Sequence, residues 1–211
     1  MSSPLVIGVL GSGKGSNFAA IADAIAAGTL DARVGVVISD VPDAGILRLA
    51  EQHGAPALHL PPGRFKTKLE PEREYELVRT LQAHGVGLVV LAGYMRLLKE
   101  PTVAAFPRRV INIHPSLLPK FPGLAAWRQA LEAGERETGC TVHFVDLGMD
   151  TGPVIARKTV PVLPDDTAET LHARIQEVEH TLYPQVIGEF ARRSQADDAE
   201  DWGEFHSGWN G

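Results

Sequence analysis

Short apolar runs alternate with amphipathic segments along the first half of the chain. Turn-forming residues bound each run, which is typical of buried strands, and the segments between carry apolar residues at helical spacing. This alternation predicts parallel strands joined by crossover helices. The predicted strands are LVIGVL (5–10), RVGVVIS (33–39), PALHL (56–60), GLVVLAG (87–93) and RVINIH (109–114), with helices expected at 17–28, 44–54, 71–85 and 96–106.

The pattern changes after residue 114. A helix-like segment at 123–134 precedes two closely spaced strand-like runs, 140–146 and 153–162, which we expect to be antiparallel. A long helix is predicted at 167–193, with Thr167 as its N-cap and a kink at Pro184. The fold class is therefore α/β: a Rossmann-like, open, mostly parallel sheet with helices on both faces and antiparallel C-terminal strands.

The composition is that of an ordinary globular protein. Of the 211 residues, 44% are hydrophobic and 22% are charged, and no apolar run approaches the roughly 20 residues that span a bilayer. The start, MSSPLVIGVLGSG, has no basic region before its apolar run, so we expect no signal peptide. Cys140 is the only cysteine, which fits a reducing compartment. The sequence thus predicts a cytoplasmic protein without membrane attachment.

Negative charge is concentrated at the C-terminus. The formal net charge is -6, and residues 194–211 carry five carboxylates but no Lys or Arg. The body is close to neutral and has no basic stripe, so a nucleic-acid partner is not expected. We expect one domain at 1–193 and an acidic, disordered tail at 194–211. Monomer and homodimer both stay open.

The glycine loop VLGSGKGSNF (9–18) is compatible with several kinds of phosphate site. A Walker A loop would need Ser or Thr after Lys14, and Gly15 stands there instead. A dinucleotide fingerprint would need a third glycine where Ser16 stands, although Asp40, at the end of the second strand, keeps that alternative open. A simple phosphate cradle from Gly15, Ser16 and Asn17 at a helix N-terminus requires the fewest specific residue types and fits this loop best. A plain strand-to-helix turn is the remaining alternative.

The segment INIHPSLLPKFPG (111–123) ends a strand with two polar side chains on one face, because residues two apart in a strand point the same way. Asn112 and His114 could therefore donate together to a developing oxyanion. If Asp150 approached His114, it would favour the imidazolium. These three residues suit direct acyl transfer, since no G-x-S-x-G elbow is present. Each also fits a structural role, as a loop cap, a buried histidine or an Asx turn.

Five motifs carry a family resemblance: GSGKGSN, AGYMRLL, INIHPSLLPKFPG, VHFVDLGMDTGPVI and RIQEVEHTLYP. In this order, over about residues 5–190, they resemble the phosphoribosylglycinamide formyltransferase family of folate-dependent purine-biosynthesis enzymes. INIHPSLLPKFPG is highly specific to folate formyl-transfer domains, whereas the glycine loop alone is weak. The resemblance implies transfer of the formyl group of 10-formyltetrahydrofolate, a co-substrate, to the amine of glycinamide ribonucleotide through a tetrahedral intermediate, without a metal.

The resemblance also implies residue roles. Asn112 and His114 would polarise the formyl oxygen, while Asp150 would relay a proton and support the imidazolium. The N-terminal half would bind phosphate and the C-terminal half folate, and the Leu118–Pro119 peptide would be cis. The implied binding residues are Gly15, Ser16, Asn17, Gln176 and Glu179 for the ribonucleotide phosphate and ribose, and Met95, Arg96, Leu98, Val145, Asp146 and Asp150 for folate.

Some features depart from the family or allow other functions. The segment 61–75 does not align, so which basic residue of 64–73 contacts a ligand stays open. A tRNA formyltransferase would be expected to carry a further C-terminal domain and a basic surface, and a formyltetrahydrofolate deformylase an N-terminal regulatory domain. A non-enzymatic nucleotide-binding module would have no use for Asn112, His114 and Asp150 together.

Overall fold

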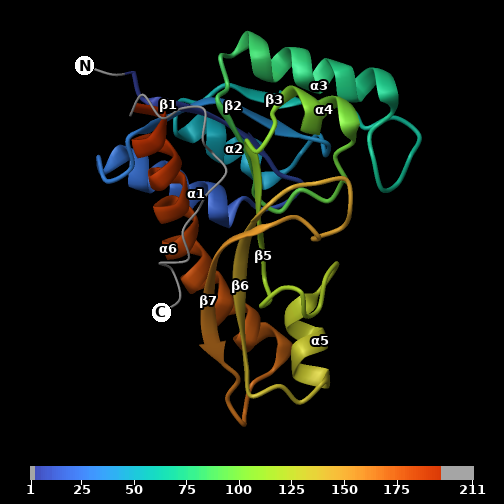
Figure 1. Cartoon of the computed structure of the whole chain (residues 1–211), viewed down its shortest axis with the longest axis vertical. Coiled ribbons are helices and arrows are strands. Elements are labelled where there is room, and N and C mark those ends of the chain that lie inside the picture. The colour runs from blue at the N-terminus through green and yellow to red at the C-terminus, as the bar shows by residue number, and fades with distance from the viewer. Residues whose placement is uncertain (1–2, 196–211) are drawn as a thin grey trace.

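A computed structural model describes residues 3–195, which form one seven-stranded sheet flanked by helices (Figure 1). The strand order is β3-β2-β1-β4-β5-β6-β7, with β1 to β5 parallel and the last two strands antiparallel to their neighbours. This confirms the predicted fold class. The strands are β1 (Leu5–Leu10), β2 (Ala32–Ser39), β3 (Ala57–His59), β4 (Leu88–Leu91), β5 (Val110–His114), β6 (Glu137–Phe144) and β7 (Val154–Pro161).

Helices cover both faces of the sheet, as predicted. One apolar core lies between the sheet and α1, α2 and α6, and a second lies between the sheet and α3 and α4. Figure 1 shows α6 running along the length of the molecule beside β6 and β7. The helices are α1 (Ser16–Ala26), α2 (Gly45–Gln52), α3 (Pro71–Ala83), α4 (Glu100–Ala105), α5 (Ala126–Glu132) and α6 (Ala168–Gln195).

The central strands are buried on both faces, which explains their nearly continuous apolar sequences. In β5, Ile111 and Ile113 point into the core beside α6. Asn112 and His114 therefore point to the opposite face, because side chains alternate along a strand. The helices α3 and α4 cover that face over β1, β2 and β4, so the end of β5 is left for polar groups.

Three boundaries differ from or refine the predictions. The helix predicted at 96–106 begins only at Glu100, because Leu97 is held extended against Thr67 by a backbone hydrogen bond. The last helix is continuous through Pro184 and includes Ser194 and Gln195, two residues beyond the predicted domain end. Thr167 caps it, accepting from Thr170 N–H at 3.3 Å, as predicted. The rest of the predicted tail, 196–211, lies outside the described residues.

None of the helices described between residues 3 and 195 is both long and apolar enough to cross a membrane. The Leu118–Pro119 peptide is cis, which confirms the expectation from the resemblance.

Candidate active site

The candidate site lies at the carboxyl ends of the parallel strands. Strand order reverses between β1 and β4, where open α/β sheets bind their ligands. The glycine loop follows β1, the Met95 segment follows β4, and Asn112 and His114 end β5. The fold therefore gathers three of the predicted motifs along one edge of the sheet.

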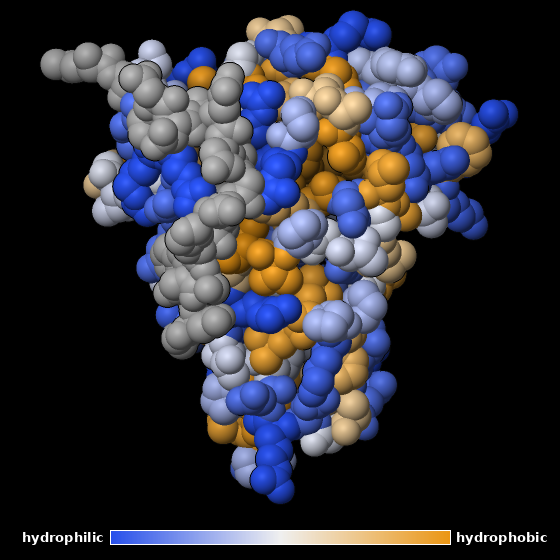
Figure 2. Space-filling model, in the orientation of Figure 1, coloured by the Kyte–Doolittle hydropathy of each residue, from blue (hydrophilic) through white to orange (hydrophobic). Residues whose placement is uncertain are grey.

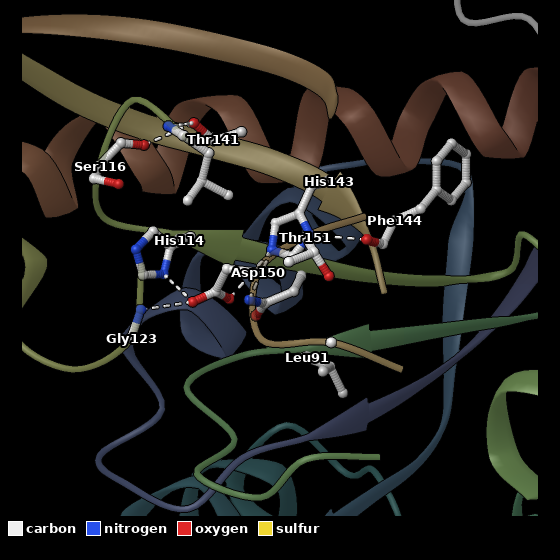
Figure 3. Close-up of polar contacts among 12 residues, drawn as sticks. Leu91, His114, Ser116, Gly123, Thr141, His143, Phe144, Asp150 and Thr151 are labelled. Atoms are coloured by element: carbon white, nitrogen blue, oxygen red, sulfur yellow. Dashed lines mark hydrogen bonds and ion pairs between the residues drawn. The ribbon is translucent and has the colours of Figure 1, made fainter. Parts of the chain in front are cut away.

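Asp150 lies in the loop between β6 and β7, and its carboxylate comes close to His114. Its Oδ2 lies 3.4 Å from His114 Nδ1 and accepts a hydrogen bond from Gly123 N–H at 2.8 Å (Figure 3). The backbone of Asp150 is left-handed, with a φ of 56°, a region that Asp and Asn adopt more readily than most residues. The hydrogen bond to Gly123 ties this loop to the one that follows His114.

His143 is a fourth member of the cluster, and its position in the sequence predicted no role for it. It lies on β6 directly opposite Asn112 in the antiparallel register. Its Nε2 is 3.2 Å from Asn112 Nδ2 and 3.6 Å from Asp150 Oδ1, and its Nδ1 donates to the Phe144 carbonyl at 2.8 Å. Figure 3 shows the ring between Asp150 and Phe144. The available sequence signals were a histidine in a buried strand and its place in the motif VHFVDLGMDTGPVI, since the register is not visible from spacing.

These contacts orient the Asn112 amide. Because Nδ1 of His143 donates to the Phe144 carbonyl, Nε2 is the ring nitrogen that can accept from Asn112. One N–H of Asn112 is then used by His143, and the second remains for another acceptor. His143, on the neighbouring strand, thus fixes the direction of the second N–H of Asn112.

Burial controls the protonation of His114. The side chain is 6% exposed, and desolvation lowers its pKa below the usual range, while the charge of Asp150 and the Phe121 carbonyl oppose that shift. The imidazolium expected from Asp150 is therefore not favoured in the substrate-free protein. Nε2 lies 2.9 Å from the Phe121 carbonyl, so both ring nitrogens face acceptors and a second proton would strengthen both contacts.

Asp150 is the anionic member of the cluster. Burial alone would raise the pKa of its carboxyl group, but the nearby His143 ring, the hydrogen bond from Gly123 N–H and the His114 ring together lower it. A charged carboxylate beside a neutral imidazole is ready to stabilise a proton that arrives on the ring.

The glycine loop leads into α1 through a residue that must be glycine. Gly15 has a φ of 85°, and a Cβ there would lie 2.8 Å from the Cα of Ile46. Ser16 and Asn17 are the first residues of α1, so their backbone N–H groups point out of the helix N-terminus without intrahelical partners. This geometry fits the predicted phosphate cradle.

Asn17 and Glu179 meet although 162 residues separate them. Asn17 Nδ2 donates to Glu179 Oε2 at 2.9 Å, while Asn17 Oδ1 is buried without a hydrogen-bond partner among residues 3–195. Glu179 is 4% exposed, and burial raises its pKa to about 7, against the smaller lowering by Asn17. Gln176 lies half-buried one turn earlier on α6. The two parts of the predicted ribonucleotide site are thus joined.

The predicted folate residues of the segment after β4 are in different environments. Met95 is 57% exposed, while Leu98 is buried in the core beside α3 and α4. Arg96 donates through Nε to Asp40 Oδ2 at 2.7 Å. In this conformation Met95 is open to a ligand, whereas the Leu98 side chain is not.

The other predicted folate residues form the loop after β6. Asp146 accepts hydrogen bonds from Gly148 N–H and the Thr151 hydroxyl at 3.0 and 2.7 Å, so its side chain holds the shape of the loop. Val145 is half-buried against the core beside α3 and α4. Figure 2 shows hydrophobic side chains gathered in a band down the middle of the molecule in this view.

The basic residues of 64–73 mostly have protein partners. Arg64 pairs with Glu70 at 3.2 Å and Arg73 with Glu76 at 2.5 Å, while Lys68 lies over the Phe65 ring. These contacts lie within the segment 64–76 and assign none of these basic residues to the proposed site. Across residues 3–195, no group of three or more His, Cys, Asp or Glu side chains is arranged to hold a metal ion.

The sequence and the fold are similar to those of known proteins. A family profile described as Formyl transferase matches residues 6–187. Phosphoribosylglycinamide formyltransferase of Bacillus subtilis strain 168 is 42% identical over 179 residues, which cover 85% of this chain and 91% of that protein. The crystal structure of glycinamide ribonucleotide transformylase 1 from Symbiobacterium toebii has a TM-score of 0.86 at 50% identity, covering 91% of this chain and 90% of that one.

A longer relative matches over only part of its length. The trifunctional purine biosynthetic protein adenosine-3 of Drosophila melanogaster is 46% identical over 183 residues, which cover 86% of this chain but 13% of that protein. The similarity therefore extends to one segment of the insect protein.

Proposed function

The chain belongs to the formyl transferase family, and we propose that it is a phosphoribosylglycinamide formyltransferase of de novo purine biosynthesis. The enzyme transfers the formyl group of 10-formyltetrahydrofolate to the amine of glycinamide ribonucleotide, giving the N-formyl product and tetrahydrofolate. The observation that carries this proposal is the convergence of Asn112, His114 and Asp150 at the end of β5, on the same edge of the sheet as the glycine loop after β1.

The first chemical step is attack of the amine on the formyl carbon. The carbonyl oxygen becomes an oxyanion in the tetrahedral intermediate, and preorganised donors that face it lower the barrier. Asn112 supplies one such donor, because His143 engages only one of its N–H groups. His114 adds a positive charge when it is protonated, while its two ring nitrogens face Asp150 and the Phe121 carbonyl in the substrate-free structure. These protein groups stabilise the oxyanion, and we propose that the reaction uses no metal ion.

The attacking nitrogen must also lose a proton. His114 is neutral at rest because of its burial, so it is available to take up that proton. The carboxylate of Asp150, 3.4 Å away, then stabilises the imidazolium. The same ring can return the proton to the folate nitrogen as the carbon–nitrogen bond to the donor breaks.

The ribonucleotide is proposed to lie between α1 and α6. Gly15, Ser16 and Asn17 would bind its phosphate with backbone N–H groups at the helix N-terminus. Glu179, with Gln176, would accept from the ribose hydroxyls. The unpartnered Oδ1 of Asn17 supports a ligand there, because a buried acceptor without a donor costs free energy that a ligand donor would recover.

The folate is proposed to lie against the segment after β4 and the loop after β6. Met95 and Val145 would contact its rings, and the backbone at Arg96, Leu98 and Asp146 would hydrogen-bond them. We also propose that the protein acts in the cytoplasm, on small molecules and not on nucleic acid, as a monomer or a homodimer.

The proposed activity is tested by the absorbance change as 10-formyltetrahydrofolate loses its formyl group, with and without glycinamide ribonucleotide. Turnover only with the ribonucleotide is the expected result. Equal turnover without it would identify water as the acceptor and overturn the proposal in favour of a deformylase. No turnover in either case, with ribonucleotide binding intact, would leave a nucleotide-binding module.

The role of His114 is tested separately. His114→Asn keeps a polar side chain but cannot take up the proton, so kcat should fall by at least about two orders of magnitude while both KM values change little. Unchanged kcat with weaker binding would contradict the assigned role.

A further inference from the structure

Asp40 is a buried acid that the proposed reaction leaves without a role. It follows β2, where dinucleotide-binding folds place an acid that holds a ribose, and its side chain is 2% exposed. Here both carboxylate oxygens are occupied by protein donors. Oδ1 accepts from the Ser12 hydroxyl at 2.5 Å, and Oδ2 accepts from Arg96 Nε at 2.7 Å. Asp40 is therefore engaged with two loops of the site and not with a nucleotide.

The first of these contacts joins the glycine loop to the segment after β4. The Ser12 hydroxyl donates to Asp40 and at the same time accepts from the backbone N–H of Met95 at 2.9 Å. The backbone N–H of Ser12 donates to the Gly93 carbonyl at 3.0 Å. Ser12 is thus attached at two points to the segment that is proposed to bind folate, and its direction is fixed by Asp40.

The second contact joins the same segment to the loop before α3. Arg96 donates through Nε to Asp40 and through Nη1 to the carbonyls of Phe65 and Lys66, both at 2.6 Å. The neighbouring residue Leu97 donates its backbone N–H to the Thr67 carbonyl at 2.9 Å. The guanidinium therefore links three separate pieces of chain, and the charge of Asp40 holds it in place.

We propose that Asp40 is a positioning residue for the folate site, which fixes the Met95–Leu98 segment through Ser12 and Arg96 and sets its distance from the glycine loop. The inference rests on the proposed function for the identity of the ligand. Both donors to Asp40 belong to, or bind directly to, residues 95 and 96. Removing its charge therefore loosens the segment from two directions at once.

Asp40→Asn is the informative change, because Asn has nearly the same shape but no charge and only one acceptor oxygen, so it cannot accept from both Arg96 and Ser12. The affinity for tetrahydrofolate should fall at least about tenfold. The effect on kcat at saturating substrates should stay within about threefold, because Asp40 contacts none of the reacting groups. KM for the ribonucleotide should rise by less than KM for the folate.

Asp166→Asn is the matched control. Asp166 pairs with Arg174 at 2.7 Å, has a side chain that is 3% exposed, and precedes α6 without contacting any proposed ligand-binding residue among those described. The Asp166→Asn substitution removes a similarly buried ion pair, so it shows how far tetrahydrofolate affinity changes when only stability is lost. Its dissociation constant for tetrahydrofolate should stay within about twofold of that of the unaltered protein.

The measurement is calorimetric titration of tetrahydrofolate into both variants and the unaltered protein, which needs no catalysis. Equal affinities in Asp40→Asn and Asp166→Asn would overturn the proposal. If Asp40→Asn does not fold, Ser12→Ala and Ser12→Thr replace it, since only Thr keeps the hydroxyl. Ser12→Ala should weaken tetrahydrofolate binding about fivefold and Ser12→Thr should restore it, while equal affinities in these two would again overturn the proposal.

Failure of the proposed function would look different. If the unaltered protein bound tetrahydrofolate but did not formylate glycinamide ribonucleotide, the reaction would be wrong and the titrations would still decide the role of Asp40. If it did not bind tetrahydrofolate, the ligand assignment and the positioning role would both fail.

Discussion

Asp150→Asn isolates the contribution of one negative charge to the proposed reaction. Asn fits the left-handed backbone at this position, and its side-chain oxygen can still accept from Gly123 N–H, so the loop should keep its shape. What is lost is the charge that faces His114 Nδ1 at 3.4 Å. The variant therefore tests electrostatics with little change in geometry.

The distance sets the magnitude. At 3.4 Å and an effective dielectric constant of about 20, a carboxylate and an imidazolium attract each other by about 5 kcal/mol. The Asn dipole and nearby water recover part of this, so we expect a loss of about 3 to 4 kcal/mol of transition-state stabilisation. At about 1.4 kcal/mol for each factor of ten, kcat should fall by two to three orders of magnitude.

The assay is the folate absorbance change at saturating concentrations of both substrates, followed across pH. Because the charge of Asp150 raises the pKa of His114, its removal should also shift the acid limb of the kcat profile to lower pH. Asp146→Asn, in the same loop but bonded to Gly148 and Thr151, is the control and should change kcat by less than tenfold. An Asp150→Asn enzyme with kcat within tenfold of normal, or no greater loss than the control, would refute the reasoning.

Three further predictions concern the residues around this centre. Asn17→Ala should raise KM for the ribonucleotide at least about tenfold and leave tetrahydrofolate binding within twofold, as measured by steady-state kinetics and titration. His143→Ala should lower kcat about tenfold, the cost of about one hydrogen bond that orients Asn112, and His143→Gln should recover part of it; equal loss in both would contradict the orienting role. The pKa of the Glu179 carboxyl group is about 7 in the folded protein against 4.5 in the unfolded chain, so the folded protein binds this proton more tightly. The resulting contribution to the free energy of unfolding is complete below about pH 4.5 and is lost as pH rises to about 7. Glu179→Gln should therefore become up to about 3 kcal/mol more stable than the unaltered protein above pH 7, with no difference near pH 4, by denaturant unfolding.

Local periodicity determined much of the fold from the sequence. The alternation of apolar runs and amphipathic segments identified the strands and helices, and the two-residue period of β5 put Asn112 and His114 on one face. The glycine loop was recognisable because backbone geometry restricts Gly15 to one residue type. These features depend on interactions between residues close in the chain, so the chain order alone carries them. The ends of the helices depend on more than local pattern. Leu97 lies outside the helix predicted at 96–106 because its backbone N–H bonds to Thr67, which is distant in the sequence.

The tertiary structure decided what depends on residues distant in the chain. The antiparallel register of β5 and β6 puts His143 opposite Asn112, and a shift of one residue would have turned that ring to the other face. Packing of α1 against α6 joins Asn17 to Glu179, and the loops after three strands give Asp40 its two donors. The same holds for protonation. The sequence could indicate that Asp150 would favour a charged His114, but the opposing and larger effect is burial, which arises only when the whole chain folds around the ring.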